Sequence, residues 1–258
     1  MQFRASFEDM LNSKKANDTA AEFIKSKIRS IVTDPKTAAV LSDIDHPYAA
    51  KRPPIDTDYF ETYNRPNVTL VDLKAAPIRQ ITEMGIRTAE AEYPVDIIVF
   101  ATGFDAMTGP LLRMDIRGRG GVALKDVWEA GPRNYLGLQV AGFPNLFTIT
   151  GPGSPSVLCN MPVAIEQHVD WITDCIDHMR ANGLERIEAR AEAVEKWVTE
   201  VNEAAARTLL PLAKHSWYLG ANIPGKPRVF MPYAGGLVRY REICQDVVAH
   251  DYEGFALS

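Results

Sequence analysis

Hydrophobic positions at helical spacing mark the first element that the sequence predicts. One apolar stripe comprises Phe23, Ile24, Ile28, Ile31 and Val32. Because these positions recur every three to four residues, they indicate an amphipathic helix. Thr19-Ala20-Ala21-Glu22 fits a capping box at its start, and Asp34-Pro35 favours its end. A stretch with three prolines follows over residues 46–54, where regular hydrogen-bonded structure is disfavoured, so we expect a boundary there.

The pattern changes to that of strands between residues 67 and 103. Val68–Leu73 is a short β-rich run, and residues 78–81 and 85–88 form a predicted hairpin that turns near Met84-Gly85. Val95–Ala101 is almost continuously apolar, which is typical of a strand covered on both faces. It runs into Thr102-Gly103-Phe104-Asp105. A buried strand followed by such a turn is typical of the ligand-facing edge of an α/β nucleotide-binding sheet.

Helices predominate in the last hundred residues. A short strand over residues 145–150 and a Gly/Pro turn over 151–156 precede a predicted long helix that ends at Asn182-Gly183. The apolar stripe of this helix comprises Ile165, Val169, Ile172, Ile176 and Met179. A second helix is predicted over about 191–210, then a Gly/Pro-rich loop over 217–236, and then a last helix that carries Leu237 and Tyr240.

Composition and charge narrow the class of protein. The chain has 258 residues, a formal net charge of −5, 46% hydrophobic and 24% charged residues, which are ordinary values for a globular protein. They exclude a disordered chain and a basic nucleic-acid binder. No apolar run approaches the ~18 residues of a membrane span, and the first fifteen residues contain no apolar h-region, so secretion is not expected. Three cysteines without CxxC spacing fit reduced thiols, so we expect a soluble cytoplasmic protein of one large or two small domains.

The turn at residues 151–156 is a candidate ligand site because the predicted helix begins just after it. A helix N-terminus offers free N–H groups and about half a positive charge. Pro152 and Pro155 lack amide hydrogens, so the turn is a poor phosphate cradle. It suits the edge of a ring that develops negative charge, with a purely structural turn as the alternative.

Other motifs give weaker or negative signals. Gly118–Ala123 matches G-x-G-x-x-A but follows no buried strand, so we interpret it as a surface turn. The five histidines show no metal-binding spacing, and the turn after residue 150 lacks the G-x-S-x-G of a hydrolase, so no metal is expected. Lys51-Arg52 is either a solvated pair or a fixed cation for an anionic intermediate. Trp217-Tyr218 either anchors a lid or pins a surface loop.

Four stretches together are similar to the C-terminal half of Baeyer–Villiger monooxygenases such as phenylacetone, steroid and cyclohexanone monooxygenases. They span residues 51–74, 96–109, 145–172 and 216–241. The resemblance implies an α/β flavoprotein with two Rossmann-like domains, one for FAD and one for NADP. It also implies a reaction in which NADPH reduces FAD, the reduced flavin reacts with O2, and one oxygen atom enters a ketone to form an ester or lactone.

The resemblance also implies roles for individual residues. Arg52 matches the catalytic arginine that stabilises the anionic peroxyflavin and the tetrahedral adduct. Trp217 matches the tryptophan of a mobile control loop, about 216–234, that folds over the nicotinamide cofactor. Cofactor contacts are implied for Lys51, Asp105, Asn160, Met161 and Trp217. Substrate contacts are implied for Ser156, Val157, Leu158 and Met231.

One departure from the family pattern is large. Its two glycine-rich fingerprints and its FxGxxxHxxxW signature, which belong to the N-terminal half, do not occur in this sequence. We therefore expect a fragment composed of the tail of a helical insertion (1–46), the end of the NADP domain (47–100) and the C-terminal part of the FAD domain (101–258). Such a chain is expected to be inactive alone and to self-associate through exposed sheet edges.

Two alternatives come from other functional classes. One is a related flavin monooxygenase that oxidises amines or sulfides, although the Arg52 match and the long control loop argue against it. The other is a non-catalytic, self-associating domain. The expected small-molecule partners are a ketone and O2, with no nucleic acid or membrane among the partners.

Overall fold

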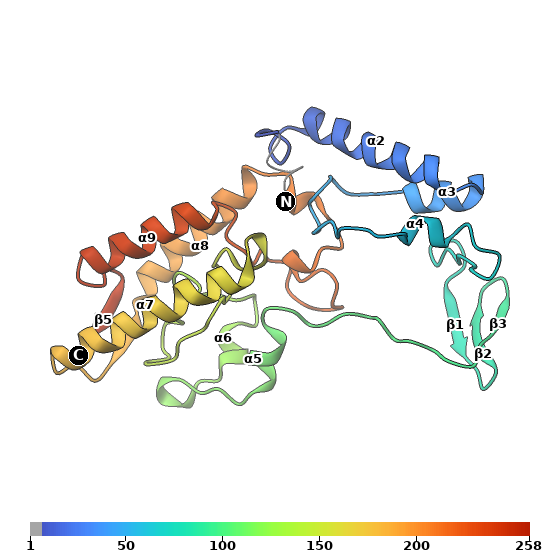
Figure 1. Ribbon diagram of the computed structural model, residues 1–258. Helices are drawn as coiled ribbons and strands as arrows, with labels where there is room; N and C mark the ends of the chain where they lie inside the picture. The colour runs from blue at the N-terminus through green and yellow to red at the C-terminus, as the bar shows by residue number, and fades with distance from the viewer. Residues whose placement is uncertain (1–6) are drawn as a thin grey trace. The chain divides into compact units, whose positions relative to one another are not determined.

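The computed structural model describes residues 7–258, which divide into two compact units (Figure 1). Unit 1 consists of residues up to 10 and 14–103, and unit 2 of residues 11–13 and 104–258. The main division thus falls in the glycine-containing turn after Ala101. Residues 1–6 of the expected helical tail lie outside the described residues. The finer division at residues 46 and 100 stays a prediction.

Unit 1 begins with two helices that confirm part of the sequence prediction. Its elements are α2 (Lys14–Ile31), α3 (Pro35–Ser42), α4 (Tyr59–Thr62), β1 (Ile78–Ile81), β2 (Gly85–Thr88) and β3 (Glu92–Pro94). The predicted capping box is wrong, because α2 starts at Lys14 and the Thr19 hydroxyl donates to the Lys15 carbonyl at 3.1 Å inside the helix. Asp34 does follow the end of α2, and its carboxylate caps α3 by accepting from the Thr37 amide at 2.7 Å.

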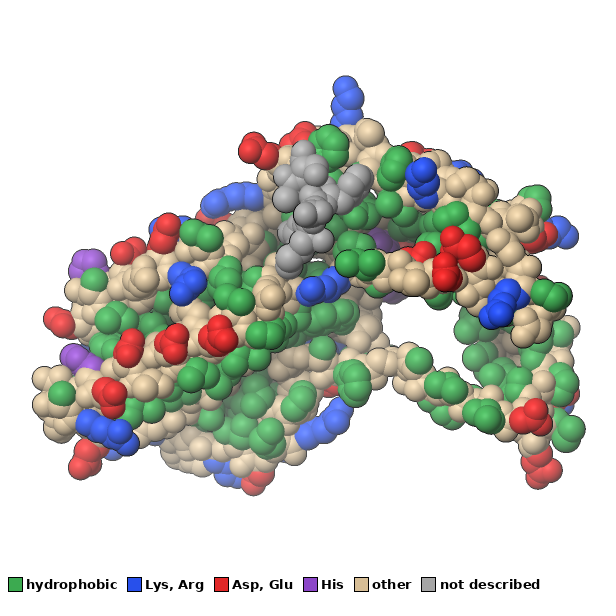
Figure 2. All heavy atoms as spheres, viewed as in Figure 1, with side chains coloured by type: hydrophobic (Ala, Val, Ile, Leu, Met, Phe, Trp, Pro, Cys, Tyr) green, Lys and Arg blue, Asp and Glu red, His purple; other side chains and the backbone are tan. Residues whose placement is uncertain are grey.

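The predicted hairpin is confirmed, and a third strand extends it. β1 pairs antiparallel with β2, and β2 with β3, in the order β1-β2-β3. The strands predicted at Val68–Leu73 and Val95–Ala101 are wrong, because neither segment is a strand. An extended backbone becomes a strand only beside a partner strand. Among the described residues neither segment has one, and the Val95 amide makes a single backbone bond to the Met84 carbonyl at 3.0 Å. Ile97 and Val99 are therefore 79% and 82% exposed instead of buried, and Figure 2 shows apolar side chains along this extended segment.

Unit 2 is mainly helical. Its regular elements are α5 (Gly109–Arg113), α6 (Leu124–Val127), α7 (Met161–Ala181), β4 (Ile187–Ala189), α8 (Ala191–Ala206), α9 (Leu237–Ala249) and β5 (Phe255–Leu257), with 3₁₀ turns at Arg119–Gly121, Ser156–Leu158, Leu210–Leu212 and Trp217–Leu219. The three long helices and the loop over 217–236 agree with the prediction. The strand predicted over 145–150 is wrong: this segment is irregular. The antiparallel β4–β5 pair was not predicted.

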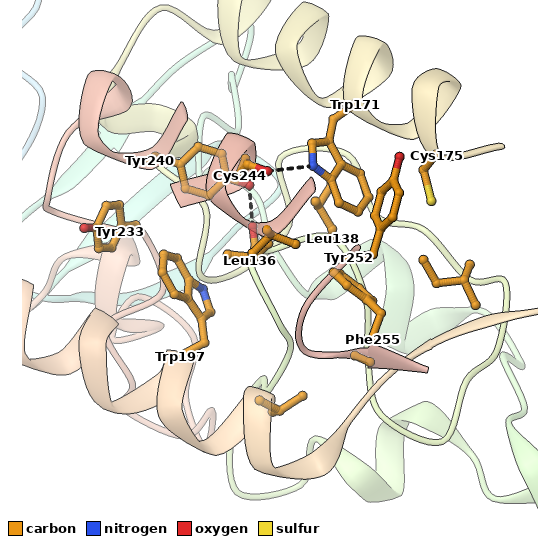
Figure 3. Close-up of a cluster of buried hydrophobic side chains, with 14 of the residues drawn as sticks. Leu136, Leu138, Trp171, Cys175, Trp197, Tyr233, Tyr240, Cys244, Tyr252 and Phe255 are labelled. Carbon is orange, nitrogen blue, oxygen red and sulfur yellow. Dashed lines mark hydrogen bonds between the residues drawn. The ribbon is translucent and has the colours of Figure 1, made fainter. Parts of the chain in front are cut away.

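The main core of unit 2 lies among α7, α8 and α9 (Figure 3). Trp171 of α7, Trp197 of α8 and Tyr240 of α9 are all at most 5% exposed. The Trp171 indole N–H donates to the Cys244 carbonyl at 3.2 Å, so the one polar group of this side chain has a hydrogen-bond partner within the core. Large aromatic side chains from all three helices therefore meet in this core.

The core-facing side of α7 overlaps the predicted apolar stripe only in part. The buried residues of α7 are Ala164, Gln167, His168, Trp171, Cys175 and Met179. Of the predicted stripe, Ile165, Val169 and Ile176 are 39%, 42% and 36% exposed. Apolar residues occupy several faces of α7, and two polar residues belong to the buried face. Met179 of the predicted stripe is buried and Ile172 packs against the core, so hydropathy located the core-facing side only in part.

Candidate functional site

The turn over residues 151–156 is buried and is held by backbone bonds from distant segments. The Gly153 amide donates to the Met231 carbonyl at 2.6 Å, and the Tyr233 amide donates to the Ser154 carbonyl at 2.7 Å. The Trp197 indole donates to the Gly153 carbonyl at 3.0 Å. The turn is thus fixed by α8 and by the end of the loop over 216–234. Segments distant in the sequence therefore hold the turn that precedes α7.

One glycine of this turn is required by close approach of the backbone. A Cβ atom at Gly151 would lie 2.6 Å from the Gly137 carbonyl oxygen, a distance that side chains essentially never adopt. Any other residue at position 151 would push the turn away from the segment around Gly137. Gly151 is therefore needed because only a residue without a Cβ atom lets the turn lie this close to the Gly137 backbone.

His168 on α7 ties the same turn to α9. Its Nδ1 accepts from the Thr150 amide at 3.0 Å, so the proton of the neutral ring lies on Nε2. Nε2 donates to the Tyr240 hydroxyl at 2.8 Å, and this hydroxyl donates to the Leu136 carbonyl at 2.5 Å. Burial lowers the pKa of His168 to about 4, since the charged imidazolium is poorly solvated there. Sequence reasoning missed this residue, because nothing in its local spacing distinguishes a buried histidine from an exposed one.

The start of α7 lies beside the residues expected to contact substrate. Ser156 is buried, with its hydroxyl 3.5 Å from the Met107 sulfur and 3.9 Å from the Met161 sulfur. Val157 and Leu158 are half-buried and Asn160 is exposed. The Asn160 side chain makes no cap bond. The first-turn amides of α7, apart from that of Pro162, can therefore interact with an electron-rich group.

The loop over residues 216–234 has a closed neck. The Met231 amide donates to the Tyr218 carbonyl at 2.9 Å, and the Ser216 hydroxyl accepts from the Tyr218 amide at 3.2 Å. The half-buried Trp217 ring packs edge-on against Tyr218 with centroids 4.7 Å apart. Met231 is buried, at 2% exposure, where the neck meets the turn at Gly153.

Asp105 contacts this loop. Its carboxylate lies 2.5 Å from the Lys226 ammonium group, and both side chains are largely buried. Lys51 and Arg52 belong instead to unit 1, where they lie in the irregular proline-rich segment; Lys51 is half-buried and Arg52 is exposed. Within unit 2 the structure therefore brings together Ser156 and Met161, Met231 and the turn, and Asp105 and the loop.

Residues 7–258 contain neither a metal-binding cluster nor a membrane-spanning helix. In this part of the chain, no three His, Cys, Asp or Glu side chains converge as a metal site. Nor does any helix there have the length and apolar character that crossing a bilayer requires. The expectation that no metal is bound stays a prediction.

Comparison with known proteins gives strong matches, although no family model matches the chain. A Baeyer–Villiger monooxygenase from Pseudooceanicola batsensis is 47% identical over 247 residues, which cover 95% of this chain and 44% of the relative. Phenazine N-monooxygenase PhzNO1 from Lysobacter antibioticus is 44% identical over 252 residues, covering 97% of this chain and 46% of the relative. The chain thus spans about half the length of the curated relatives it matches.

Solved structures of monooxygenases are also similar to this chain. Oxidised steroid monooxygenase bound to NADP superposes with a TM-score of 0.91 at 52% identity, over 99% of this chain and 48% of that one. OTEMO in complex with FAD and NADP superposes with a TM-score of 0.93 at 43% identity, over 98% and 46%. The expected fold class, part of a two-dinucleotide-binding flavoprotein, is therefore confirmed. The chain is a homologue of the Baeyer–Villiger monooxygenases and corresponds to about half of one.

The described residues fit only part of a flavin cofactor. Both sheets are antiparallel, so the parallel βαβ unit whose glycine-rich turn holds a dinucleotide pyrophosphate is not found in residues 7–258. The start of α7 is different: its first-turn amides follow a rigid turn and fit the electron-rich edge of a ring.

Proposed function

We propose that this chain forms part of an FAD- and NADPH-dependent Baeyer–Villiger monooxygenase that inserts one oxygen atom of O2 into a ketone to give an ester or lactone. The observation that carries the proposal is the braced turn before α7, with the loop over 216–234 closed against it, in a chain 52% identical to a steroid monooxygenase. When bound, FAD reduced by NADPH supplies the oxygen-activating chemistry. The ketone and O2 are the proposed small-molecule partners.

The proposed roles divide between the two units. In unit 1 the Arg52 guanidinium is a permanent cation that stabilises negative charge formed near the flavin, and Lys51 contacts NADP. In unit 2 the amides after Asn160 and at Met161 face the flavin ring edge, and Trp217 covers the nicotinamide. The proposed domains remain 1–46, 47–100 and 101–258.

The proposed substrate wall consists of the 3₁₀ turn Ser156–Leu158 together with Met231. Val157 and Leu158 are half-buried and apolar, which suits the carbon skeleton of a ketone. Ser156 and Met231 are buried, so they support this wall from behind instead of forming its open face. Asp105 is proposed to affect cofactor binding indirectly, by positioning the loop, because its carboxylate is paired with Lys226.

The 258 residues by themselves are proposed to bind neither FAD nor NADPH at micromolar concentration, because residues 7–258 contain no parallel dinucleotide cradle. The chain, expressed in flavin-rich medium, is passed through gel filtration. We expect a colourless protein peak. A flavin absorbance band that stays with the chain would contradict this part of the proposal.

The activity is tested by adding a polypeptide that corresponds to the part of the relatives that this chain does not cover. The chain is co-expressed with a polypeptide covering the remaining part of steroid monooxygenase, and ketone-dependent NADPH oxidation and ester formation are measured. Arg52→Ala is expected to lower ester formation by orders of magnitude while the flavin stays bound. Arg79→Ala, in exposed strand β1, is the control and is expected to leave the rate unchanged. A flavin-loaded complex with no ester product, or with full activity in Arg52→Ala, refutes the assigned chemistry.

N-oxygenation is a second candidate function, because the phenazine N-monooxygenase is as similar to the chain as several ketone oxygenases. Mass spectrometry of the same complex incubated with a ketone and with phenazine separates the two. An N-oxide without ester would favour the second function.

A further inference from the structure

The loop over 216–234 is attached at two places, through backbone hydrogen bonds at one and through side chains at the other. Its neck is attached through the backbone, between Tyr218 and Met231 and from Met231 to Gly153. Its tip, residues 219–230, is attached through side chains. Two tip residues, Asn222 and Lys226, reach the segment Phe104–Ala106, which lies more than a hundred residues earlier in the chain.

The contact made by Lys226 is the stronger of the two. Its ammonium group lies 2.5 Å from an Asp105 carboxylate oxygen and donates to the Ala106 carbonyl at 3.0 Å. The two side chains are only 10% and 23% exposed, so solvent screens this ion pair less than a surface pair. Asn222 adds one hydrogen bond, from its amide group to the Phe104 carbonyl at 3.2 Å.

Neighbouring glycines leave room for this arrangement. A Cβ atom at Gly109 would lie 2.6 Å from the Asp105 carboxyl carbon, so only glycine at this position allows the carboxylate its observed place. On the loop side, Gly220 has φ +67, and a Cβ atom there would lie 3.2 Å from the Lys226 side chain. Both partners of the ion pair are thus packed against glycine backbone.

We propose that the Asp105–Lys226 ion pair is a latch that holds the tip of the loop closed while the neck stays attached to the turn. Breaking the pair removes the charge-assisted contact of the tip but leaves the backbone bonds of Tyr218, Gly153 and Met231 intact. Residues 219–229 can then open as a unit while Phe230, which is 6% exposed, stays packed in the core. Lys226 and Asp105 are positioning residues for the loop, and this role does not depend on the proposed oxygenation.

Limited proteolysis of the full chain measures the opening of the tip directly. Trypsin cleaves after Arg228, an exposed residue within the tip, but not after Lys226, because Pro227 follows it. Replacing Lys226 therefore leaves the reporter site unchanged. The unfolding midpoint of each variant is measured in parallel by tryptophan fluorescence, so that faster cleavage can be separated from global unfolding.

In Lys226→Met and in Asp105→Asn we expect cleavage at Arg228–Val229 to accelerate about tenfold, with a nearly unchanged midpoint. Because the two residues act through each other, the double variant is expected to stay within about twofold of the faster single variant. Gly109→Ala, which displaces the Asp105 carboxylate without removing its charge, is expected to accelerate cleavage in the same direction. Lys214→Met, at an exposed lysine before the loop, is the control and is expected to leave cleavage unchanged.

Wild-type cleavage in a folded Lys226→Met variant overturns the proposal. So does a double variant whose effect is the product of the two single effects, since the residues would then act independently. Both results concern the loop alone, so they are distinct from a failure of the proposed oxygenation, which is measured as ester formation in the flavin-loaded complex.

Discussion

Acid should destabilise unit 2 through a single buried histidine. The pKa of His168 falls from 6.5 to about 4 because burial disfavours the charged ring. The neutral ring donates to Tyr240 and accepts from Thr150. Between these two pKa values the unfolded chain binds a proton that the folded chain does not. The free energy of unfolding therefore decreases as the pH falls from about 6.5 to about 4, and the loss is complete below pH 4.

The size of the effect follows from the two pKa values. One pKa unit corresponds to about 1.4 kcal/mol, so the full shift costs about 3 kcal/mol by pH 4 and about 2 kcal/mol at pH 5. This is a large share of the about 5–15 kcal/mol that stabilises a typical domain. We therefore expect the effect to be measurable well above the pH at which a carboxylate of ordinary pKa is protonated.

Urea unfolding followed by tryptophan fluorescence provides the assay. All four tryptophans lie in unit 2, so the signal reports on the unit that contains His168. His168→Gln cannot titrate, and its free energy of unfolding should fall between pH 7 and pH 5 by about 2 kcal/mol less than that of the wild type. The control is His215→Gln, at an exposed histidine, which should keep the wild-type pH dependence. Parallel pH profiles for wild type and His168→Gln would refute the reasoning.

Three further predictions concern packing and association. Trp197→Phe removes the donor to the Gly153 carbonyl and leaves the ring volume largely filled; we expect a loss of about 1–3 kcal/mol in the free energy of unfolding, and no loss in urea unfolding would contradict it. Glu188→Gln weakens the ion pair with Arg119 and the bond accepted from the Gly142 amide at 2.9 Å, which should cost about 1–2 kcal/mol; Glu185→Gln, at an exposed site, is the control in the same measurement. Replacing both Ile97 and Val99 by Asp should reduce self-association in analytical ultracentrifugation without changing the fluorescence-detected unfolding midpoint, because both side chains are exposed; an unchanged association constant would rule out this segment as the contact.

Local sequence determined the elements that depend on nearby residues. α2, α7, α8 and α9 lie where the apolar periodicity predicted helices, and the β1–β2 hairpin lies where two short runs flank a turn. A helix satisfies its backbone within four residues, and a hairpin within about ten, so short-range patterns suffice for both. The resemblance to Baeyer–Villiger monooxygenases was equally visible in the sequence, because it rests on stretches of consecutive residues.

Tertiary structure decided the features that join distant residues. Whether Val95–Ala101 became a strand depended on a partner strand, which none of the described residues supplies, and the pairing of β4 with β5 joins segments about seventy residues apart. The buried face of α7 includes His168, which is hydrogen-bonded to two other segments, whereas several apolar side chains of the helix are exposed. The same holds for Asp105, because its ion pair with Lys226 joins residues more than a hundred positions apart in the chain. Sequence patterns encode how a segment can fold locally, but burial and pairing are properties of the contact between segments.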